Sequence, residues 1–520
     1  MSEHSQEGRE ARTPNIVLIT TDQQRYDTLG ATGNPHVRTP AMDALAERGT
    51  VFDHAYIQNP VCMPSRACIH TGRYVHQHGV EYMRSDIDQT PGLPPGEVTA
   101  AERLKEAGYC TAAFGKIHLM PPRGFDELRL TQGKGARWTT STGSPYGPAQ
   151  LGPIYEEWLE ERNPGAYEQI YEARRTPEYE EHDTAVPSTI PAEQYVDSWI
   201  GENAADYIAR DHESPFFAVV GFCGPHTPFD PPEPYASEYD RDAMPVPELF
   251  DAESPSALVH GRRPQFDGPG RAENIRRVIA YYWGMMSLID DMVAKIVAAA
   301  EERDDGRDTI IVMTTDHGEM LGDFGGLGKG NFTEGVIRVP LVVASISGTQ
   351  SSSQRVDDLV EHVDLVPTIL DWAGIPHPAE LPGRSLRAYL EAERAAPQPR
   401  DSILCEFTTN ARDARSRCLR TDRYKYVFHD GERPAEFYDL HDDPAETENL
   451  AGDPAYADLV QEHATLLLER LSGTVLSAWN TTPAARHPES IDDYGRPLAG
   501  GHAKEDRLVS SPPNREENSA

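Results

Sequence analysis

Residues 15–20 read Asn-Ile-Val-Leu-Ile-Thr, and this short run, rich in β-branched side chains, decides the fold. Its four central residues are all apolar, which predicts a strand buried on both faces in the interior of a parallel sheet. Residues 216–220 and 309–314 show the same pattern. Strands that alternate with helices indicate an α/β fold with helices on both faces of the sheet. Amphipathic segments that predict those helices lie at residues 40–48, 101–107 and 279–300.

Polar side chains follow each of the three predicted strands. Asp22-Gln23 comes after the first strand, Pro225-His226 after the second and Asp316-His317 after the third. Ligands of open α/β sheets bind beyond the carboxyl ends of the strands, so we expect these residues to converge. Two carboxylates, an amide oxygen and an imidazole suit Ca²⁺ or Mg²⁺, and the imidazole leaves Mn²⁺ possible. The alternative is that each Asp simply caps a turn or a helix.

The composition fits a soluble globular protein of two or more domains. The chain has 520 residues, of which 38% are hydrophobic and 25% charged. No apolar run reaches the roughly 18 residues of a membrane span, so no membrane contact is expected. Residues 1–13 are polar and lack the pattern of a signal peptide, and a cytoplasmic location is therefore the default expectation.

The formal net charge is −36, with seven lysines against 41 arginines. A surface this acidic opposes nucleic-acid binding, which needs a basic footprint, so no nucleic-acid partner is expected. It also favours a halophilic origin with a high-salt cytosol, although a GC-rich genome alone would explain the preference for Arg over Lys. Six cysteines without regular spacing predict neither a disulfide framework nor a structural zinc site.

The chain divides into a main α/β domain, residues 13–390, and a small α+β domain, residues 401–475. A helix and a linker are expected over 386–400. Residues 485–520 are polar, rich in Pro and Gly, and expected to be disordered. Within the small domain, strands are predicted at 403–407, 417–420 and 424–428 and a helix at 456–471. Residues 128–200 read as an excursion from the sheet, in which Trp138, Tyr146, Tyr155 and Trp158 could stack on a substrate ring or simply pack.

Three sequence motifs resemble those of a known protein family. Cys62-Met63-Pro64-Ser65-Arg66, followed by Thr71-Gly72-Arg73, resembles the signature of the type I, formylglycine-dependent sulfatases of the alkaline phosphatase superfamily. Residues 108–118 resemble the second signature of that family, and residues 316–329 resemble a third region. The resemblance covers about residues 13–475. It implies an alkaline-phosphatase-like fold, with a large mixed or mostly parallel sheet between helices and a smaller C-terminal α+β subdomain.

The resemblance also implies the chemistry. In that family a maturation enzyme oxidises the motif cysteine to formylglycine, whose hydrated aldehyde is the nucleophile and whose second hydroxyl expels sulfate. The arginine orients the diol, the first lysine and histidine contact sulfate and formylglycine, the next histidine protonates the leaving oxygen, and the last lysine binds sulfate. The catalytic residues implied are Cys62, Arg66, Lys116, His118, His226 and Lys329. The metal ligands implied are Asp22, Gln23, Cys62, Asp316 and His317.

The metal and the substrate stay open at this point. Calcium is the cation expected first, but the Asp-Gln and Asp-His pairs also resemble those of choline sulfatases and phosphonate monoester hydrolases, so Mg²⁺ and Mn²⁺ remain alternatives. Lys116 and His118, two apart on an extended segment, are expected to point to one side. Where relatives often have Gly-Asp-His-Gly, this chain has Phe324 in place of the histidine, which removes that group from the rim of the cleft.

Three hypotheses follow. The first is a sulfatase that cleaves a small-molecule or carbohydrate sulfate monoester, with a formylglycine-generating enzyme as its maturation partner. The second is a phosphonate monoester or phosphodiester hydrolase on the same scaffold, because tetrahedral oxyanions of sulfur and phosphorus are nearly isosteric. The third is a non-catalytic anion-binding homologue, which the loss of Cys62, Arg66 or a metal-binding Asp would have favoured. The oligomeric state cannot be predicted from the sequence.

Overall fold

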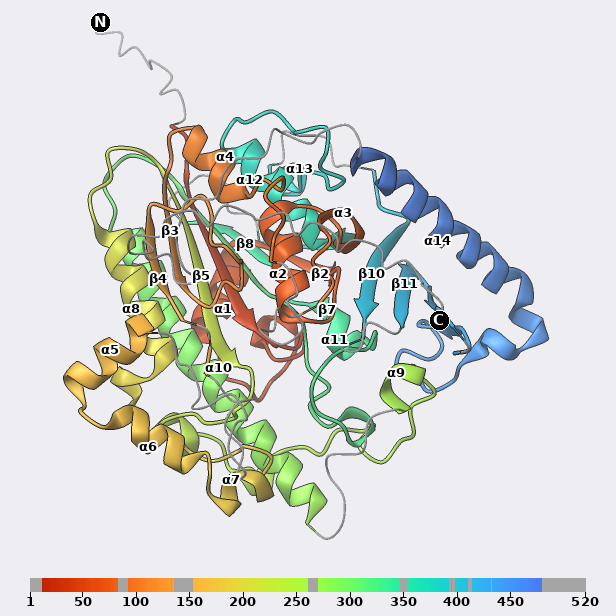
Figure 1. The fold of residues 1–520 in the computed structure, drawn as a ribbon, viewed down its shortest axis with the longest axis horizontal. Helices are drawn as coiled ribbons and strands as arrows, with labels where there is room; N and C mark the ends of the chain where they lie inside the picture. The colour runs from red at the N-terminus through yellow and green to blue at the C-terminus, as the bar shows by residue number, and fades with distance from the viewer. Residues whose placement is uncertain are drawn as a thin grey trace, which may run out of the picture.

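The computed structural model describes residues 12–82, 92–131, 133–134, 153–260, 270–346, 353–391, 394, 398–409, 414–431 and 433–478. In this part of the chain the strands form one nine-stranded sheet and one four-stranded sheet. Figure 1 shows the two sheets side by side, with helices packed around them. The predicted tail and the aromatic residues Trp138 and Tyr146 lie outside the described residues. The domain boundaries at 390 and 401 stay predictions.

The large sheet is mixed and mostly parallel, as predicted. Its order is β4-β3-β5-β1-β6-β8-β2-β7, and β9 also pairs with β2. From β4 to β6 all neighbours are parallel, whereas β8 is antiparallel to β6 and β2, and β7 is antiparallel to β2. The strands are β1 (Asn15–Asp22), β2 (Thr50–Tyr56), β3 (Cys110–Gly115), β4 (Glu127–Leu130), β5 (Phe216–Pro225), β6 (Thr309–Thr315), β7 (Arg338–Val339), β8 (Val342–Ser345) and β9 (Gln354–Glu361).

Helices cover both faces of this sheet, which explains the continuous apolar runs in its strands. Ile16 and Leu18 of β1 face one side, Val17 and Ile19 the other, and all four are at most 1% exposed. The face of Val17 is covered by α1 (Pro40–Arg48), α8 (Val196–Ala209) and α10 (Arg271–Glu301). The face of Ile16 is covered by α2 (Cys62–Thr71), α4 (Ala100–Glu106) and α12 (Leu365–Trp372).

The predicted helices of the main domain are present, with shifts at their ends. The helix predicted at 40–48 has those bounds, and α10 begins at Arg271, before the predicted start at 279. Helix α4 starts where Thr99 accepts a hydrogen bond from the backbone of Glu102, whose side chain bonds back to Thr99. The remaining short helices are α3 (Val75–His78), α5 (Pro153–Arg162), α6 (Ala166–Ala173), α7 (Pro177–Glu181), α9 (Ala257–His260), α11 (Glu334–Ile337) and α13 (Arg387–Leu390).

The helix predicted ahead of the linker within 386–400 is wrong in length, because α13 has only four residues. The backbone of Glu391 is extended, and side chains tie the segment to the end of α12 instead of to a further helical turn. Arg387 donates to the carbonyl of Asp371 at 2.8 Å, and Arg394 pairs with the carboxylate of Asp371 at 3.0 Å. These tertiary contacts override the local helix preference.

The small sheet is antiparallel, in the order β10-β11-β12-β13. Three of its four strands match strands predicted from the sequence, and the edge strand β13 is the fourth. Helix α14 (Ala457–Ala478) packs along it, with Leu467 buried against Leu419 and Phe437 (Figure 1). The strands are β10 (Ser402–Thr408), β11 (Arg415–Thr421), β12 (Tyr424–His429) and β13 (Glu436–Asp439).

Two of the aromatic residues in the excursion pack inside the protein. The ring centroids of Tyr155 and Trp158 lie 5.4 and 6.4 Å from that of Trp199 in α8. Their rings therefore hold α5 against the main domain. All six cysteines are free, five of them buried. None of the helices in the described part of the chain combines the length and the apolar character that a membrane span needs.

Candidate active site at the carboxyl edge of the sheet

The three predicted strand ends meet at one edge of the large sheet. In the register of the sheet, Asp22 pairs with Pro225 of β5, and Thr21 pairs with Thr315 of β6. The residues that follow these strands therefore start from neighbouring positions, as expected for parallel strands. His226 Nε2 lies 4.0 Å from Asp22 Oδ1, and Asp316 Oδ1 accepts a hydrogen bond from the backbone of Gln23 at 3.1 Å.

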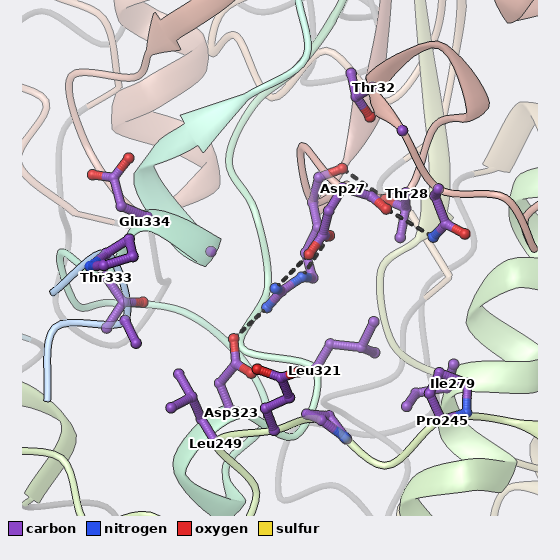
Figure 2. A pocket seen from close by; sticks show the side chains of 18 of the residues that line it. Asp27, Thr28, Thr32, Pro245, Leu249, Ile279, Leu321, Asp323, Thr333 and Glu334 are labelled. Atoms are coloured by element: carbon purple, nitrogen blue, oxygen red, sulfur yellow. Dashed lines mark hydrogen bonds and ion pairs between the residues drawn. The ribbon is translucent and has the colours of Figure 1, made fainter. Parts of the chain in front are cut away.

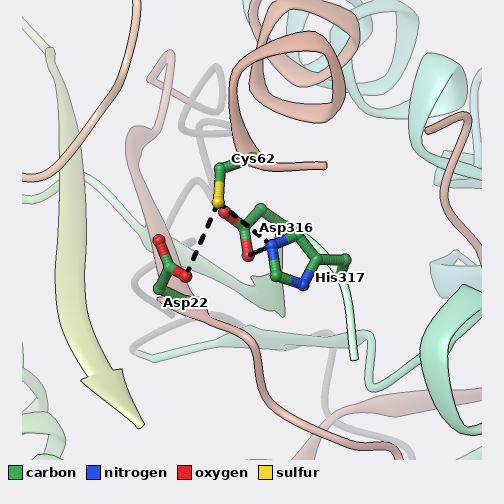
Figure 3. A group of neighbouring side chains, drawn as sticks. All are labelled: Asp22, Cys62, Asp316 and His317. Atoms are coloured by element: carbon green, nitrogen blue, oxygen red, sulfur yellow. Dashed lines mark hydrogen bonds and ion pairs between the residues drawn. The ribbon is translucent and has the colours of Figure 1, made fainter. Parts of the chain in front are cut away.

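Four of the predicted metal ligands form a compact buried group (Figure 3). One potential ligand atom from each of Asp22, Cys62, Asp316 and His317 lies within 4.8 Å of the others. Cys62 Sγ is 3.2 Å from His317 Nε2 and 3.9 Å from Asp22 Oδ1. Cys62 comes from the start of α2, whereas Asp22 ends β1 and Asp316 and His317 follow β6, so the group joins a helix terminus to the sheet edge.

Helix α2 starts at Cys62, and the preceding residue Val61 offers no side-chain cap. The free N–H groups of the first turn therefore add positive potential beside the thiol. The helix is held over the site by Ser65, whose hydroxyl donates to the carbonyl of Asp316 at 2.5 Å. Arg66 lies one turn after Cys62, as predicted, and its side chain is 1% exposed.

Arg66 links the two buried carboxylates. Its guanidinium lies 2.8 Å from Asp316 Oδ2 and 3.2 Å from Asp22 Oδ2, and it also donates to the carbonyl of Lys116. Gly221 makes this approach possible, since a Cβ at that position would lie 2.1 Å from the carbonyl oxygen of Lys116 and 3.3 Å from Arg66. The pairing compensates charges that would be costly to bury alone.

Two lysines that are far apart in the sequence reach the site. Lys116 Nζ lies 2.6 Å from Asp22 Oδ2, and Lys329 Nζ lies 2.9 Å from Cys62 Sγ. Burial favours the neutral amine, but the carboxylate of Asp22 raises the pKa of Lys116 above its ordinary value. Burial likewise opposes ionisation of Asp22, but Lys116, His226, Lys329 and Arg66 hold its pKa well below the ordinary range.

The imidazoles of His317 and His226 share one arrangement. Each Nδ1 faces a carbonyl oxygen, of Gly318 at 2.9 Å and of Thr227 at 2.6 Å, and must therefore carry the proton. Nε2 then holds the free lone pair. Burial, with the charge of Lys329, lowers the pKa of His317 to about 4 and that of His226 well below its usual value.

His118 departs from the expected geometry. The expectation that Lys116 and His118 lie on an extended segment is wrong, because β3 ends at Gly115 and His118 has φ +47, in the left-handed region. It still lies near the cluster, since burial and the charges of Lys116 and Arg66 hold its pKa well below the ordinary value. Its Nδ1 has no hydrogen-bond partner within the described residues.

The predicted site residues thus gather in one place, with a buried base and a more open rim. The rim is formed by residues that are only half-buried: His118, His226 and Lys329. The base holds Asp22, Gln23, Cys62, Arg66, Lys116, Asp316 and His317, which are at most 5% exposed.

One residue of this site was missed by the sequence analysis. Glu319 is fully buried, and its carboxylate accepts a hydrogen bond from the side-chain amide of Gln23. The same carboxylate accepts from the backbone of Gly328, next to Lys329. The signal in the sequence was the glutamate that ends the run Asp-His-Gly-Glu at 316–319, which nothing local distinguishes from a surface acid.

The donor set fits a divalent cation. Asp22 and Asp316 provide carboxylate oxygens, and His317 turns the lone pair of Nε2 toward the same point. The amide oxygen of Gln23 faces Lys329 at 2.9 Å, since its nitrogen is taken by Glu319. Three oxygens and one imidazole suit a hard or borderline ion such as Ca²⁺, Mg²⁺ or Mn²⁺.

A cavity of about 660 Å³ lies beside this site (Figure 2). Asp27 and Thr28, from the loop after β1, line one part of it, and Leu249 and Asp323 line another. None of the predicted site residues is in its lining. Arg25 lines the cavity and donates to Asp323 at 2.7 Å and to the carbonyl of Glu319 at 3.0 Å. Phe324, at the position where relatives often carry histidine, lines this cavity.

Comparisons with known proteins agree with this geometry. The sulfatase family model matches residues 14–375, and a model described as N-sulphoglucosamine sulphohydrolase, C-terminal, matches residues 322–472. The multifunctional alkaline phosphatase superfamily protein PehA of Trinickia caryophylli is 31% identical over 508 residues, covering 88% of this chain and 95% of that protein. An arylsulfatase of Clostridium perfringens is 28% identical over 468 residues, with the same two coverages.

Among solved structures, the phosphonate monoester hydrolase of Agrobacterium radiobacter matches with a TM-score of 0.71 at 25% identity, covering 91% of this chain and 100% of that chain. Its fold is therefore shared along almost the whole of both chains. Together with a family model that spans well over half of the sequence, this leaves one conclusion: the chain belongs to the sulfatase family of the alkaline phosphatase superfamily, and it is a hydrolase of that family.

Proposed function

We propose that this protein hydrolyses an organic sulfate monoester with the help of a divalent cation and a formylglycine derived from Cys62. One observation carries the proposal: Cys62 Sγ lies within 3.2 Å of both Lys329 Nζ and His317 Nε2, at the base of a buried cluster. A residue placed there touches the predicted cation ligands and an anion-binding lysine at once. A purely structural cysteine would have no need of that surrounding charge.

The cationic side chains suit recognition of a sulfate group. Lys116 and Lys329 direct ammonium groups toward Asp22 and Cys62, and Arg66 neutralises the carboxylates beneath. If a tetrahedral anion binds between the two lysines, their ammonium groups would replace part of the hydration that its oxygens lose. In our proposal the carboxylate of Asp22, which raises the pKa of Lys116, keeps that lysine positively charged for this purpose.

The thiol itself is a poor nucleophile at this position. Burial and the neighbouring carboxylate of Asp22 raise the pKa of Cys62, so the thiol stays protonated near neutral pH. Oxidation to formylglycine would supply, once hydrated, a hydroxyl nucleophile in place of the sulfur. A divalent cation held by Asp22, Gln23, Asp316 and His317 would supply positive charge against the sulfate oxygens and favour the deprotonated hydroxyl.

His226 is proposed to move the proton of the leaving group. Its Nδ1–H donates to the carbonyl of Thr227, which fixes the ring and leaves Nε2 as the atom that exchanges a proton. That ring is half-buried at the rim, where the leaving oxygen of a bound ester would lie. Arg66, by contrast, makes all its contacts inside the protein and is proposed to orient the residue at position 62.

We propose calcium as the bound cation, with manganese as the main competitor because His317 adds an imidazole to the oxygen ligands. Elemental analysis of protein purified without added metal decides between them. Restoring activity with each ion after chelation then shows which ion supports turnover. A protein that is fully active without any bound metal would contradict the cation.

A phosphonate monoester or phosphodiester hydrolase is the second candidate, favoured by the shared fold of the Agrobacterium radiobacter phosphonate monoester hydrolase. Comparing kcat/KM for 4-nitrophenyl sulfate, 4-nitrophenyl phenylphosphonate and bis(4-nitrophenyl) phosphate separates the two. Our proposal predicts the highest value for the sulfate. A preference for either phosphorus ester would reverse the assignment. Mass spectrometry of the tryptic peptide that contains Cys62 tests the modification: an unchanged thiol in fully active protein would exclude formylglycine.

The physiological substrate is proposed to be a sulfated carbohydrate or another small sulfate ester. Relatives along most of this chain include proteins named delta 4,5-hexuronate-2-O-sulfatase and choline-sulfatase, at 27% and 28% identity. A panel of sulfated monosaccharides, choline sulfate and aryl sulfates tests this proposal. Turnover of aryl sulfates alone, with no natural sulfate ester accepted, would count against it.

A further inference from the structure

Glu319 is a buried carboxylate that the chemistry above does not use. Its side chain is 0% exposed, and it forms no ion pair with Lys or Arg within the described residues. A buried charge without an opposite charge is costly unless hydrogen bonds compensate it. Three N–H groups do so here: the amide of Gln23, the backbone of Gly328 and the backbone of Leu321, the last at 3.2 Å.

The contact with Gln23 determines which end of that amide faces the cation cluster. An amide can turn its oxygen or its NH₂ group toward a neighbour, but only the oxygen can bind a cation. A carboxylate only accepts hydrogen bonds, so Glu319 takes the NH₂ group of Gln23. Lys329 only donates, and it binds the oxygen of the same amide at 2.9 Å. Both neighbours therefore select the orientation that leaves the oxygen on the side of the site.

The hydrogen bond from Gly328 to Glu319 affects the position of Lys329, the lysine that is predicted to bind the sulfate. Glu319 accepts from the backbone N–H of Gly328, and Met320 donates to the carbonyl of Gly328 at 2.9 Å. These two bonds close the base of the loop 320–328, directly before Lys329. One carboxylate thus holds both the amide of Gln23 and the backbone that carries Lys329.

We propose that Glu319 is a positioning residue that orients Gln23 toward the bound cation and holds Lys329 at the sulfate. The inference rests on the proposed function, because it assumes that a cation occupies the cluster of Asp22, Asp316 and His317. Residues that hold metal ligands in place typically change metal affinity by roughly 10- to 100-fold when they are replaced. Glu319 acts through Gln23 and Lys329 and does not touch the substrate.

The substitution Glu319→Gln gives a specific prediction. The two backbone N–H groups of Gly328 and Leu321 cannot rotate, so the oxygen of the new amide stays with them. Its NH₂ group then faces Gln23, which must turn its own oxygen away from the cation and offer NH₂ instead. We expect the Kd for Ca²⁺ or Mn²⁺, measured by calorimetry on chelator-stripped protein, to rise by about 10- to 100-fold.

The swapped pair tests the mechanism. Adding Gln23→Glu to Glu319→Gln restores an acceptor opposite the new NH₂ group, and the introduced carboxylate can still give its second oxygen to the cation. The double variant should bind the cation more tightly than either single variant, because Gln23→Glu alone sets two carboxylates against each other. Asp290→Asn, which also removes a buried carboxylate bonded to two backbone N–H groups, is the matched control and should leave the Kd unchanged.

The outcomes separate this inference from the proposed function. Cation binding by Glu319→Gln as tight as that of the wild type would overturn the positioning role. So would a double variant no tighter than the single ones, and this comparison stands even if one single variant fails to fold. A wild type that shows the expected Kd pattern but no sulfate turnover would keep the inference and remove the sulfatase proposal. If the wild type binds no cation, the inference about Glu319 is overturned. The sulfatase proposal is then judged separately, by the turnover assay.

Discussion

Arg66 and Asp316 form an ion pair that is closed off from water, with Arg66 Nε 2.8 Å from Asp316 Oδ2 and the two side chains 1% and 0% exposed. The same guanidinium reaches Asp22 at 3.2 Å, so the side chain of Arg66 joins α2 to the ends of β1 and β6. The two carboxylates would otherwise repel each other at the base of the site. Because Cys62 lies one helical turn before Arg66, the pair also fixes the position of Cys62.

Replacing this arginine should therefore destabilise the fold. Arg66→Met leaves two buried carboxylates without their guanidinium, and breaking a buried pair in this way costs about 3–5 kcal/mol. Denaturant titration measures the free energy of unfolding. Arg415→Met is the matched control, since Arg415 pairs with Glu81 at the surface, with exposures of 57% and 29%, where about 0–1 kcal/mol is expected. Equal losses in the two variants would show that Arg66 is not a buried electrostatic link.

Cys62→Ala should abolish turnover and leave the fold intact. The substitution removes the predicted nucleophile but only one buried sulfur, so little packing is lost. Cys62→Ser should behave in the same way unless the host can oxidise serine at this position. Turnover of 4-nitrophenyl sulfate and circular dichroism together check both points. More than a trace of activity in Cys62→Ala would mean that another residue is the nucleophile.

Strands buried on both faces could be predicted from the sequence because their signal is local. The runs in β1, β5 and β6 have apolar centres and are buried throughout, and the polar residues at their carboxyl ends sit at the sheet edge by the geometry of parallel strands alone. The motifs at Cys62 and Lys116 could be placed by resemblance. Their meeting with Asp22 follows once the strand order is known.

The remaining features depend on contacts far apart in the sequence. Strand β7 has only two residues and is defined by its pairing with β2, and β9 carries the exposed charged residues Arg355 and Asp357. The left-handed backbone of His118 depends on how the chain leaves β3, and no residue type in this segment predicts that conformation. Glu319 could not be separated from a surface acid, because its partners Gln23 and Gly328 are brought to it only by the fold.

Removal of the proposed cation should abolish catalytic activity, and adding the cation back should restore it. Asp316→Asn takes a negative ligand from a hard cation, and we expect activity to fall by several orders of magnitude together with the metal content. Exhaustive chelation of the wild type should have the same effect, with Ca²⁺, Mg²⁺ or Mn²⁺ restoring turnover. Elemental analysis accompanies each assay. A chelated protein that is metal-free and still fully active would exclude a catalytic cation.

Asp290 predicts a pH-dependent stability outside the active site. Its carboxylate lies in α10 and accepts from the backbones of Ala41 and Met42 at 3.0 and 2.8 Å, but burial raises its pKa to about 7. The folded state therefore holds this proton more tightly than the unfolded state. Stability from this group is fully present below about pH 4 and is lost as the pH rises to about 7, by at most about 4 kcal/mol.

The variant Asp290→Asn lacks this titration, so it isolates the effect from all other groups. The free energy of unfolding of the wild type minus that of the variant should fall between about pH 4.5 and 7 and stay level above that range. Denaturant titrations at several pH values measure the difference. A difference that does not change with pH would show that Asp290 titrates in the folded protein as it does in the unfolded chain.

The net charge of −36 predicts how the protein responds to salt. The folded state concentrates this charge, and unfolding spreads it apart, so self-repulsion lowers stability at low ionic strength. Added salt shortens the Debye length from roughly 10 Å at 0.1 M to about 3 Å at 1 M, which removes most of the repulsion between exposed carboxylates. The buried pair of Arg66 with Asp22 and Asp316 is screened far less, so the site itself should keep its charges in place.

We therefore expect the melting temperature to rise markedly between about 0.1 M and 2 M KCl, with sulfatase activity maintained over that range. Differential scanning calorimetry on the metal-loaded protein measures the first, and turnover of 4-nitrophenyl sulfate measures the second. Sucrose at matched viscosity serves as a control, because it stabilises without screening charge. A melting temperature that is flat or falls with KCl would show that the acidic surface is not an adaptation to a high-salt cytoplasm. The family assignment does not depend on that result, since it stands on the family model that matches residues 14–375 and on the relatives along most of the chain.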